Sequence, residues 1–185
     1  MITRRQTPPV VGFLAIALLA ACTTAGPAAT ASVGSPVAVA APPGEPLGAL
    51  PGVEGFAYHA ESGAVPGFLA GAEETLGDEV EVGIVQATVA NRGDDEVSLI
   101  AFTFPGATDA QAVDSFARIL DDIEDGFGAG SERGLGGDAY VMTGDGQTAV
   151  LAPWGRTADQ LVFLFALGHA GATEELVTAI LDAQG

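Results

Sequence analysis

The stretch from Leu161 to Leu167 reads Leu-Val-Phe-Leu-Phe-Ala-Leu and contains no polar residue. A strand with one face in water would alternate between apolar and polar side chains. This stretch therefore predicts a central strand, with neighbouring strands on both edges and with cover on both faces or most of them. The rest of the chain has to supply those neighbours and that cover.

Four further segments have the pattern of strands. In the first of them the alternation shifts phase between Ile84 and Val85, which predicts a β-bulge. The polar turn 91–96 joins the first two segments and predicts a hairpin. The segments are Val80–Ala90, Val97–Phe104, Ala139–Thr143 and Thr148–Trp154.

Three segments have apolar residues at helical spacing. In the first, Pro66 comes early and Gly77 follows as a stop signal. The second begins at Thr108 and Gln111, which have the form of a capping box, and Thr173 is the expected cap of the third. The predicted helices are Val65–Leu76, Asp109–Glu124 and Glu174–Ala183.

The predicted order of elements is α-ββ-α-βββ-α. Hairpin-linked strands, separated by helices with one apolar face each, favour an α+β fold. We expect a two-layer sandwich, in which helices lie mainly on one face of an antiparallel sheet of about five strands. The folded domain is expected to span residues 53–185.

The chain of 185 residues is strongly acidic, with six arginines, no lysine and 24 Asp and Glu residues, for a formal charge of −18. This charge excludes a nucleic-acid binder, because phosphates would be repelled. It favours a neutral or cationic partner instead. Since Cys22 is the only cysteine, no disulfide can form within the chain.

The N-terminus has the pattern of an export signal. Arg4 and Arg5 precede the uncharged stretch Val10–Ala21. Twelve helical residues would extend over about 18 Å, which is too short for a hydrocarbon core of roughly 30 Å. The segment 1–21 is therefore predicted to be a signal peptide and not a transmembrane helix.

The signal ends in Leu19-Ala20-Ala21-Cys22. This tetrapeptide resembles the lipobox of bacterial lipoprotein precursors, and the layout of the chain is similar to small secreted lipoproteins of high-GC bacteria. The resemblance implies cleavage between Ala21 and Cys22 and a diacylglyceryl group on the Cys22 thiol. It implies an anchored protein on the extracytoplasmic face of the cell membrane.

Residues 22–52 are expected to form a tether after the lipidated cysteine. This segment holds six prolines and a single charge, Glu45. Such a composition favours a partly polyproline-like spacer with a reach of about 90 Å at ~3.1 Å per residue. Loss of residues 1–21 removes two arginines and no acid, so the formal charge goes from −18 to −20.

One segment nearly matches a calcium-binding EF-hand loop. Asp121, Asp125, Gly126 and Glu132 fall at positions 1, 5, 6 and 12 of that pattern. Position 3 is Ile123, which cannot bind a cation and belongs to the apolar stripe of the predicted helix. We interpret the segment as an acidic helix end that leads into a glycine-rich connecting loop, 126–137, and we predict no metal or cofactor.

No assembled catalytic set is recognisable. The two histidines, His59 and His169, have no pattern of metal ligands around them, and the chain has no nucleophile elbow. The aromatic residues Tyr58, Tyr140 and Trp154 could line a pocket, although aromatic residues in strands are usually part of the core.

The sequence therefore predicts a lipid-anchored extracytoplasmic domain that binds or senses a component of the cell envelope without catalysis. One alternative is a carrier of an apolar ligand, with a cavity between helices and sheet. The other is an enzyme whose site is scattered through the fold. A lined cavity between the layers would favour the carrier, and His59 beside clustered acids in a cleft would favour the enzyme.

Overall fold

A computed structural model describes residues 50–60, 63–128, 132–135, 139–157 and 159–183. The predicted signal peptide 1–21, Cys22 and the tether as far as residue 49 lie outside the described residues. Leu50 is already buried in the core, and the carbonyl of Pro51 accepts a hydrogen bond of 2.8 Å from the Tyr58 hydroxyl. The domain thus includes residues before the expected start at residue 53.

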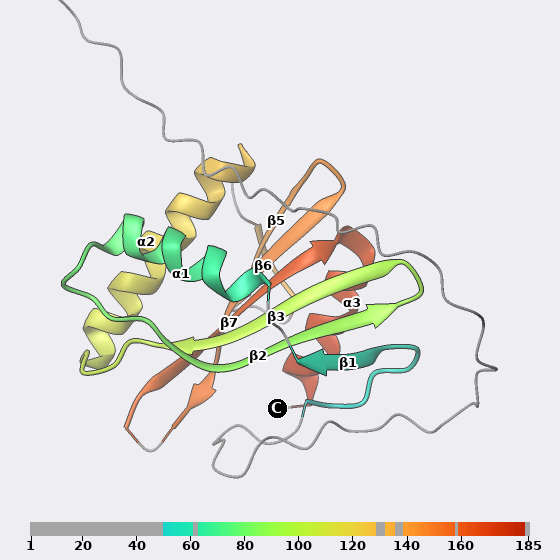
Figure 1. Cartoon of the computed structure of the whole chain (residues 1–185), viewed down its shortest axis with the longest axis horizontal. Coiled ribbons are helices and arrows are strands. Elements are labelled where there is room, and N and C mark those ends of the chain that lie inside the picture. Colours follow the sequence, from blue (N-terminus) through green and yellow to red (C-terminus); the bar gives the residue numbers. More distant parts are fainter. Residues whose placement is uncertain (1–49, 61–62, 129–131, 136–138, 158, 184–185) are drawn as a thin grey trace, which may run out of the picture.

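The stretch 161–167 lies in β7 (Leu161–His169), the middle strand of a seven-stranded antiparallel sheet (Figure 1). The strand order is β1-β2-β3-β7-β6-β5-β4, so β7 pairs with β3 on one side and with β6 on the other. The prediction of a central strand is confirmed. The remaining strands are β1 (Ala57–Ala60), β2 (Gly83–Arg92), β3 (Asp95–Thr103), β4 (Glu132–Gly134), β5 (Ala139–Gly144) and β6 (Gln147–Arg156).

The strand count differs from the expected five or so. The five predicted strands are the inner ones, and the two additional strands, β1 and β4, lie at the two edges of the sheet. They contain four and three residues, too few for an alternating pattern to be recognised. The predicted bulge is confirmed, because the register of β2 against β3 shifts between Ile84 and Gln86.

The helices are α1 (Ala64–Leu76), α2 (Asp109–Phe127) and α3 (Ala170–Asp182). The capping box of α2 is present: the Thr108 hydroxyl accepts from the Gln111 backbone N–H, and the Gln111 side chain accepts from the Thr108 backbone N–H. A cap of this kind typically contributes about 1 kcal/mol. Gly128 ends the helix in the left-handed conformation, at φ 63°.

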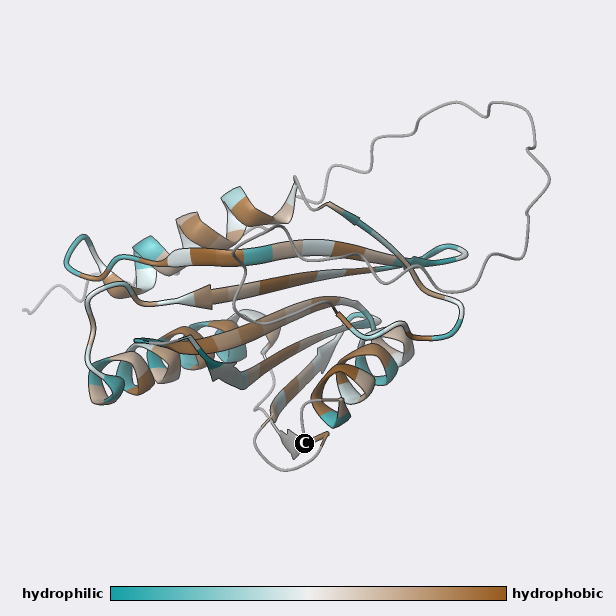
Figure 2. Cartoon of the chain, turned by 90° about the horizontal axis from the view of Figure 1, so that it is seen from below, coloured by the Kyte–Doolittle hydropathy of each residue, from teal (hydrophilic) through white to brown (hydrophobic). Residues whose placement is uncertain are grey.

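The helices cover both faces of the sheet, which corrects the expected two-layer arrangement to three layers. The side chains of Phe102, Phe163 and Phe165 pack with α1 and α2. Their neighbours Ala101, Leu164 and Ala166 face the other way and pack with α3. Because both faces of the central strands are apolar, cover on a single face would leave the second face in water. In Figure 2 the inner strands of the sheet are mostly brown, the colour of hydrophobic residues.

The last helix begins earlier than expected. It starts at Ala170, directly after β7, and His169 stands at its N-cap position without a side-chain cap. Thr173, the expected cap, lies inside the helix and its hydroxyl donates to the His169 carbonyl at 2.9 Å. The direct passage from strand to helix leaves no loop between them.

Candidate functional site

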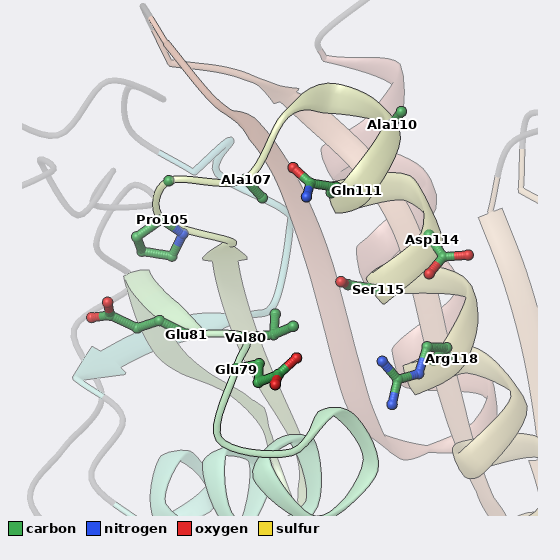
Figure 3. Close-up of a pocket in the computed structure, with 11 residues that line it drawn as sticks. Glu79, Val80, Glu81, Pro105, Ala107, Ala110, Gln111, Asp114, Ser115 and Arg118 are labelled. Atoms are coloured by element: carbon green, nitrogen blue, oxygen red, sulfur yellow. The ribbon is translucent and has the colours of Figure 1, made fainter.

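A groove of about 480 Å³ opens on the surface between the loop after α1, the loop after β3 and the N-terminal half of α2. Figure 3 shows its lining. We call it the acidic groove, because the side chains of Glu79, Glu81 and Asp114 line it. Ser115, Arg118 and Pro105 also contribute to its surface.

The topology of the hairpin brings the first two loops together. In the antiparallel pair of β2 and β3, Gly83 is opposite Thr103, so the chain entering β2 and the chain leaving β3 meet at the same end of the sheet. Gly77 and Gly106, both at φ 76°, provide the left-handed backbone at which these loops turn. The N-terminal half of α2 is the third wall of the groove, and the capping box fixes the residue at which this helix begins.

The charge of the acidic groove is mostly unbalanced. The side chains of Glu79, Glu81 and Asp114 form none of the ion pairs found among the described residues. Arg118 is the one cation in the lining, and its Nη2 donates to the Thr75 carbonyl of α1 at 2.6 Å. Three carboxylates against one guanidinium leave a net charge of −2 in the lining at neutral pH.

Ser115 lies on the α2 wall of the groove and is only 5% exposed. In Figure 3 its hydroxyl oxygen points from α2 toward the loop that carries Glu79. No hydrogen bond links the Ser115 hydroxyl to another described residue. It is therefore a polar group of a nearly buried residue whose hydrogen bonds are not made within the described part of the chain.

The space between α1, α2 and the sheet is filled by aromatic side chains. The ring of Phe163 stacks on that of Phe116 with centroids 4.6 Å apart, and the ring of Phe68 stacks on that of Phe165 at 5.2 Å. Phe102 joins both pairs, at 5.7 Å from Phe163 and 4.9 Å from Phe68. The acidic groove lies outside this packed core.

The residues of the EF-hand-like segment do not form a loop. Asp121, Asp125 and Gly126 lie within α2, whereas Glu132 belongs to β4. Among the described residues, no group of three or more His, Cys, Asp or Glu side chains is placed to hold a metal ion.

The two histidines lie apart from the groove. His59 is exposed on the edge strand β1, and Nδ1 of His169 lies 2.9 Å from an Asp95 carboxylate oxygen at the far end of the β2–β3 hairpin. Of the aromatic residues considered for a pocket, Trp154 is buried in the core on the α3 face, and its Nε1 has no partner among the described residues. Tyr140 packs against Phe116, with ring centroids 6.2 Å apart.

Two titratable groups outside the groove have shifted pKa values. Burial raises the pKa of Tyr58 above 10.0, and a backbone hydrogen bond with Val53 partly offsets this shift. The protonated hydroxyl is therefore favoured in the folded state. The hydrogen bonds and the charge of Asp109 raise the pKa of Arg156, which is exposed and bonds that carboxylate at 2.9 and 3.1 Å.

The sequence analysis missed the residues of the acidic groove. Glu79 and Glu81 come from one loop and Asp114 and Ser115 from a helix 33 or more residues later, so no local motif contains them. One signal was available: a predicted antiparallel hairpin places its entering and leaving loops at one end of the sheet.

Comparison of the chain with protein-family models, curated proteins and solved structures finds no match. Within the described part of the chain, none of the helices has both the length and the apolar character needed to cross a bilayer.

Proposed function

We propose that this chain is a lipid-anchored protein of the extracytoplasmic membrane face whose domain binds a positively charged ligand in the acidic groove, without catalysis. The lipobox-like Leu19-Ala20-Ala21-Cys22 supports the anchor. The observation that carries the binding role is the groove itself, with three carboxylates that have no cationic partner at its surface. Such a lining attracts cations and repels anions.

The other two functions considered have less support. A carrier of an apolar ligand would need a lined cavity between helices and sheet, but the rings of Phe102, Phe116 and Phe163 occupy the space under α2. A site built on His59 would need that side chain in the groove, and it lies on β1 instead.

The anchor is tested by phase separation in a cloud-point detergent. The wild-type chain should enter the detergent-rich phase, because two or three acyl chains give stable membrane attachment. A Cys22→Ser chain should move to the aqueous phase once its leader is absent. Mass spectrometry of the N-terminal peptide should show acyl chains on Cys22. A wild-type peptide without lipid, or a leaderless Cys22→Ser chain that stays in detergent, would contradict the anchor.

The binding role is tested by titrating the full chain with n-butylammonium and following backbone amide shifts by NMR at low salt. Binding should be saturable, with the largest shifts around the groove. The double change Glu79→Gln and Asp114→Asn should weaken it roughly tenfold, and 0.5 M NaCl should weaken it further, because exposed charges are screened.

The matched control is the double change Asp94→Asn and Glu96→Gln, which removes two exposed carboxylates at the opposite end of the β2–β3 hairpin. It changes the net charge of the protein without touching the groove, so the affinity should stay within about twofold of wild type at the salt used. Equal affinities for wild type and the double variant would refute the groove as the binding site.

A further inference from the structure

We infer that the ligand of the acidic groove is an organic cation, a primary ammonium or guanidinium on a short aliphatic chain, and that Ser115 accepts a hydrogen bond from it. This inference rests on the cation-binding function proposed above. It adds the chemical class of the ligand and a residue that selects it.

The first argument is the state of the Ser115 hydroxyl. Serine and threonine side chains inside helices commonly donate to the carbonyl four residues earlier. Thr75, Thr173 and Thr178 do so here, at 2.9, 2.9 and 2.7 Å. Ser115 makes no such bond, although it is 95% buried, and its oxygen points into the groove (Figure 3). A hydroxyl left in this way can accept an N–H from a ligand.

Two polar groups near Ser115 are already engaged. The Gln111 side-chain oxygen accepts from the backbone N–H and the hydroxyl of Thr108, at 2.9 and 2.8 Å. Arg118 donates to the Thr75 carbonyl. Ser115 and the carboxylate of Asp114 are thus groups on the α2 wall that have no hydrogen-bond partner among the described residues, and a ligand that carries N–H donors could bond to both.

The second argument is how the carboxylates are distributed. In Figure 3, Glu79 lies beside Val80 on the side that faces α2, Glu81 extends from the same loop away from α2, and Asp114 belongs to α2. The three carboxylates therefore do not converge on one point. The oxygen ligands of a bound metal ion have to converge in that way. Apolar side chains also line the groove, namely Val80, Pro105, Ala107 and Ala110. Methylene groups of an extended cation would contact them.

The experiment compares two monocations with the same chain, n-butylammonium and n-butyltrimethylammonium, on the full-length protein. Only the first has N–H groups. Wild type should bind n-butylammonium roughly tenfold more tightly, because a hydrogen bond to a charged group of this kind is worth about one order of magnitude. In Ser115→Ala that preference should disappear, through loss of n-butylammonium affinity with n-butyltrimethylammonium unchanged.

The outcomes separate the two proposals. Equal binding of both cations by wild type would overturn the role of Ser115 and leave the cation groove standing. Displacement of n-butylammonium by an equal concentration of CaCl2 would overturn the organic-cation assignment. If neither organic cation binds and Ca2+ does not bind either, the proposed function itself is refuted. If Ser115→Ala fails to fold, Ser115→Cys keeps nearly the same side-chain size with a much weaker acceptor, and it should reduce the preference in the same way.

Discussion

Replacing Gly168 with alanine is expected to destabilise the fold by about 3 kcal/mol or more. Gly168 lies in β7 and pairs with Val97 of β3. A Cβ atom at this position would overlap the Glu96 carbonyl oxygen and lie 2.9 Å from the Val97 Cα. Both are backbone atoms of a paired strand, so they cannot move aside without breaking the β3–β7 pairing.

The same Cβ atom would also lie 3.0 Å from the Thr173 hydroxyl, which bonds the His169 carbonyl at the first turn of α3. The substitution therefore strains two contacts of β7 at once, the one with β3 and the one with α3.

The matched control is Gly171→Ala, three residues later in α3. A Cβ atom there meets nothing within 4 Å, and Gly171 is exposed. Alanine in a helix is favoured over glycine, so this change should leave stability unchanged or raise it by up to about 1 kcal/mol. Urea denaturation of the full chain, followed by circular dichroism, measures both. Similar midpoints for the two variants would show that the contact at Gly168 is not tight.

Replacing Phe163 with alanine is expected to cost about 3–5 kcal/mol, the range found when a large aromatic side chain is removed from a packed core. Phe163 is 2% exposed. Its ring lies 4.6 Å from that of Phe116, 5.6 Å from that of Phe104 and 5.7 Å from that of Phe102, measured between centroids. Phe102 belongs to β3, Phe104 to the loop after β3 and Phe116 to α2. Because these three elements are held separately, the rings cannot all move into the cavity that the substitution leaves.

Two controls accompany this prediction. Phe163→Leu keeps most of the apolar volume and should lose clearly less stability than Phe163→Ala. Val113→Ala removes a side chain that is 54% exposed on α2 and should change stability by no more than about 0.5 kcal/mol. Fluorescence of Trp154, the only tryptophan, gives a second probe of unfolding. A loss below 1 kcal/mol for Phe163→Ala would contradict the packing described for this core.

The sequence predicted those parts of the fold that depend on local patterns. The apolar run 161–167 is the central strand, and Thr108 with Gln111 caps the longest helix. The phase shift near Val85 is a bulge of β2. In each case the residues that form the pattern are within a few positions of one another. The structure that they favour can therefore be predicted from the sequence alone.

The parts that were wrong depend on contacts between distant segments. The edge strands β1 and β4 exist through pairing with β2 and β5, and nothing in their few residues requires it. The start of α3 was placed at Thr173 because that residue type often caps helices, whereas the chain turns into the helix at once after β7. The third layer exists because α3 packs on the second face of the sheet.

The acidic groove could not be predicted as a unit for a related reason. Its carboxylates come from the loop before β2 and from α2, and each of them alone looks like an ordinary exposed acid. What makes them a candidate site is the shared end of the hairpin together with the unbonded hydroxyl of Ser115. Both features exist only in the folded chain.

The strand order has a consequence for how the chain acquires its structure. The middle strand β7 and its neighbour β3 are distant in sequence, and Ile100 of β3 is paired with Phe165 of β7. The chain is synthesised from its N-terminus, so β7 is the last strand to be made, and until then the hairpin of β2 and β3 has an unpaired apolar edge. Such non-local pairing is associated with slow folding. Until the pairing forms, the unpaired strand edge can aggregate with other chains. The protein should therefore depend on protection of the nascent chain until its final residues are free.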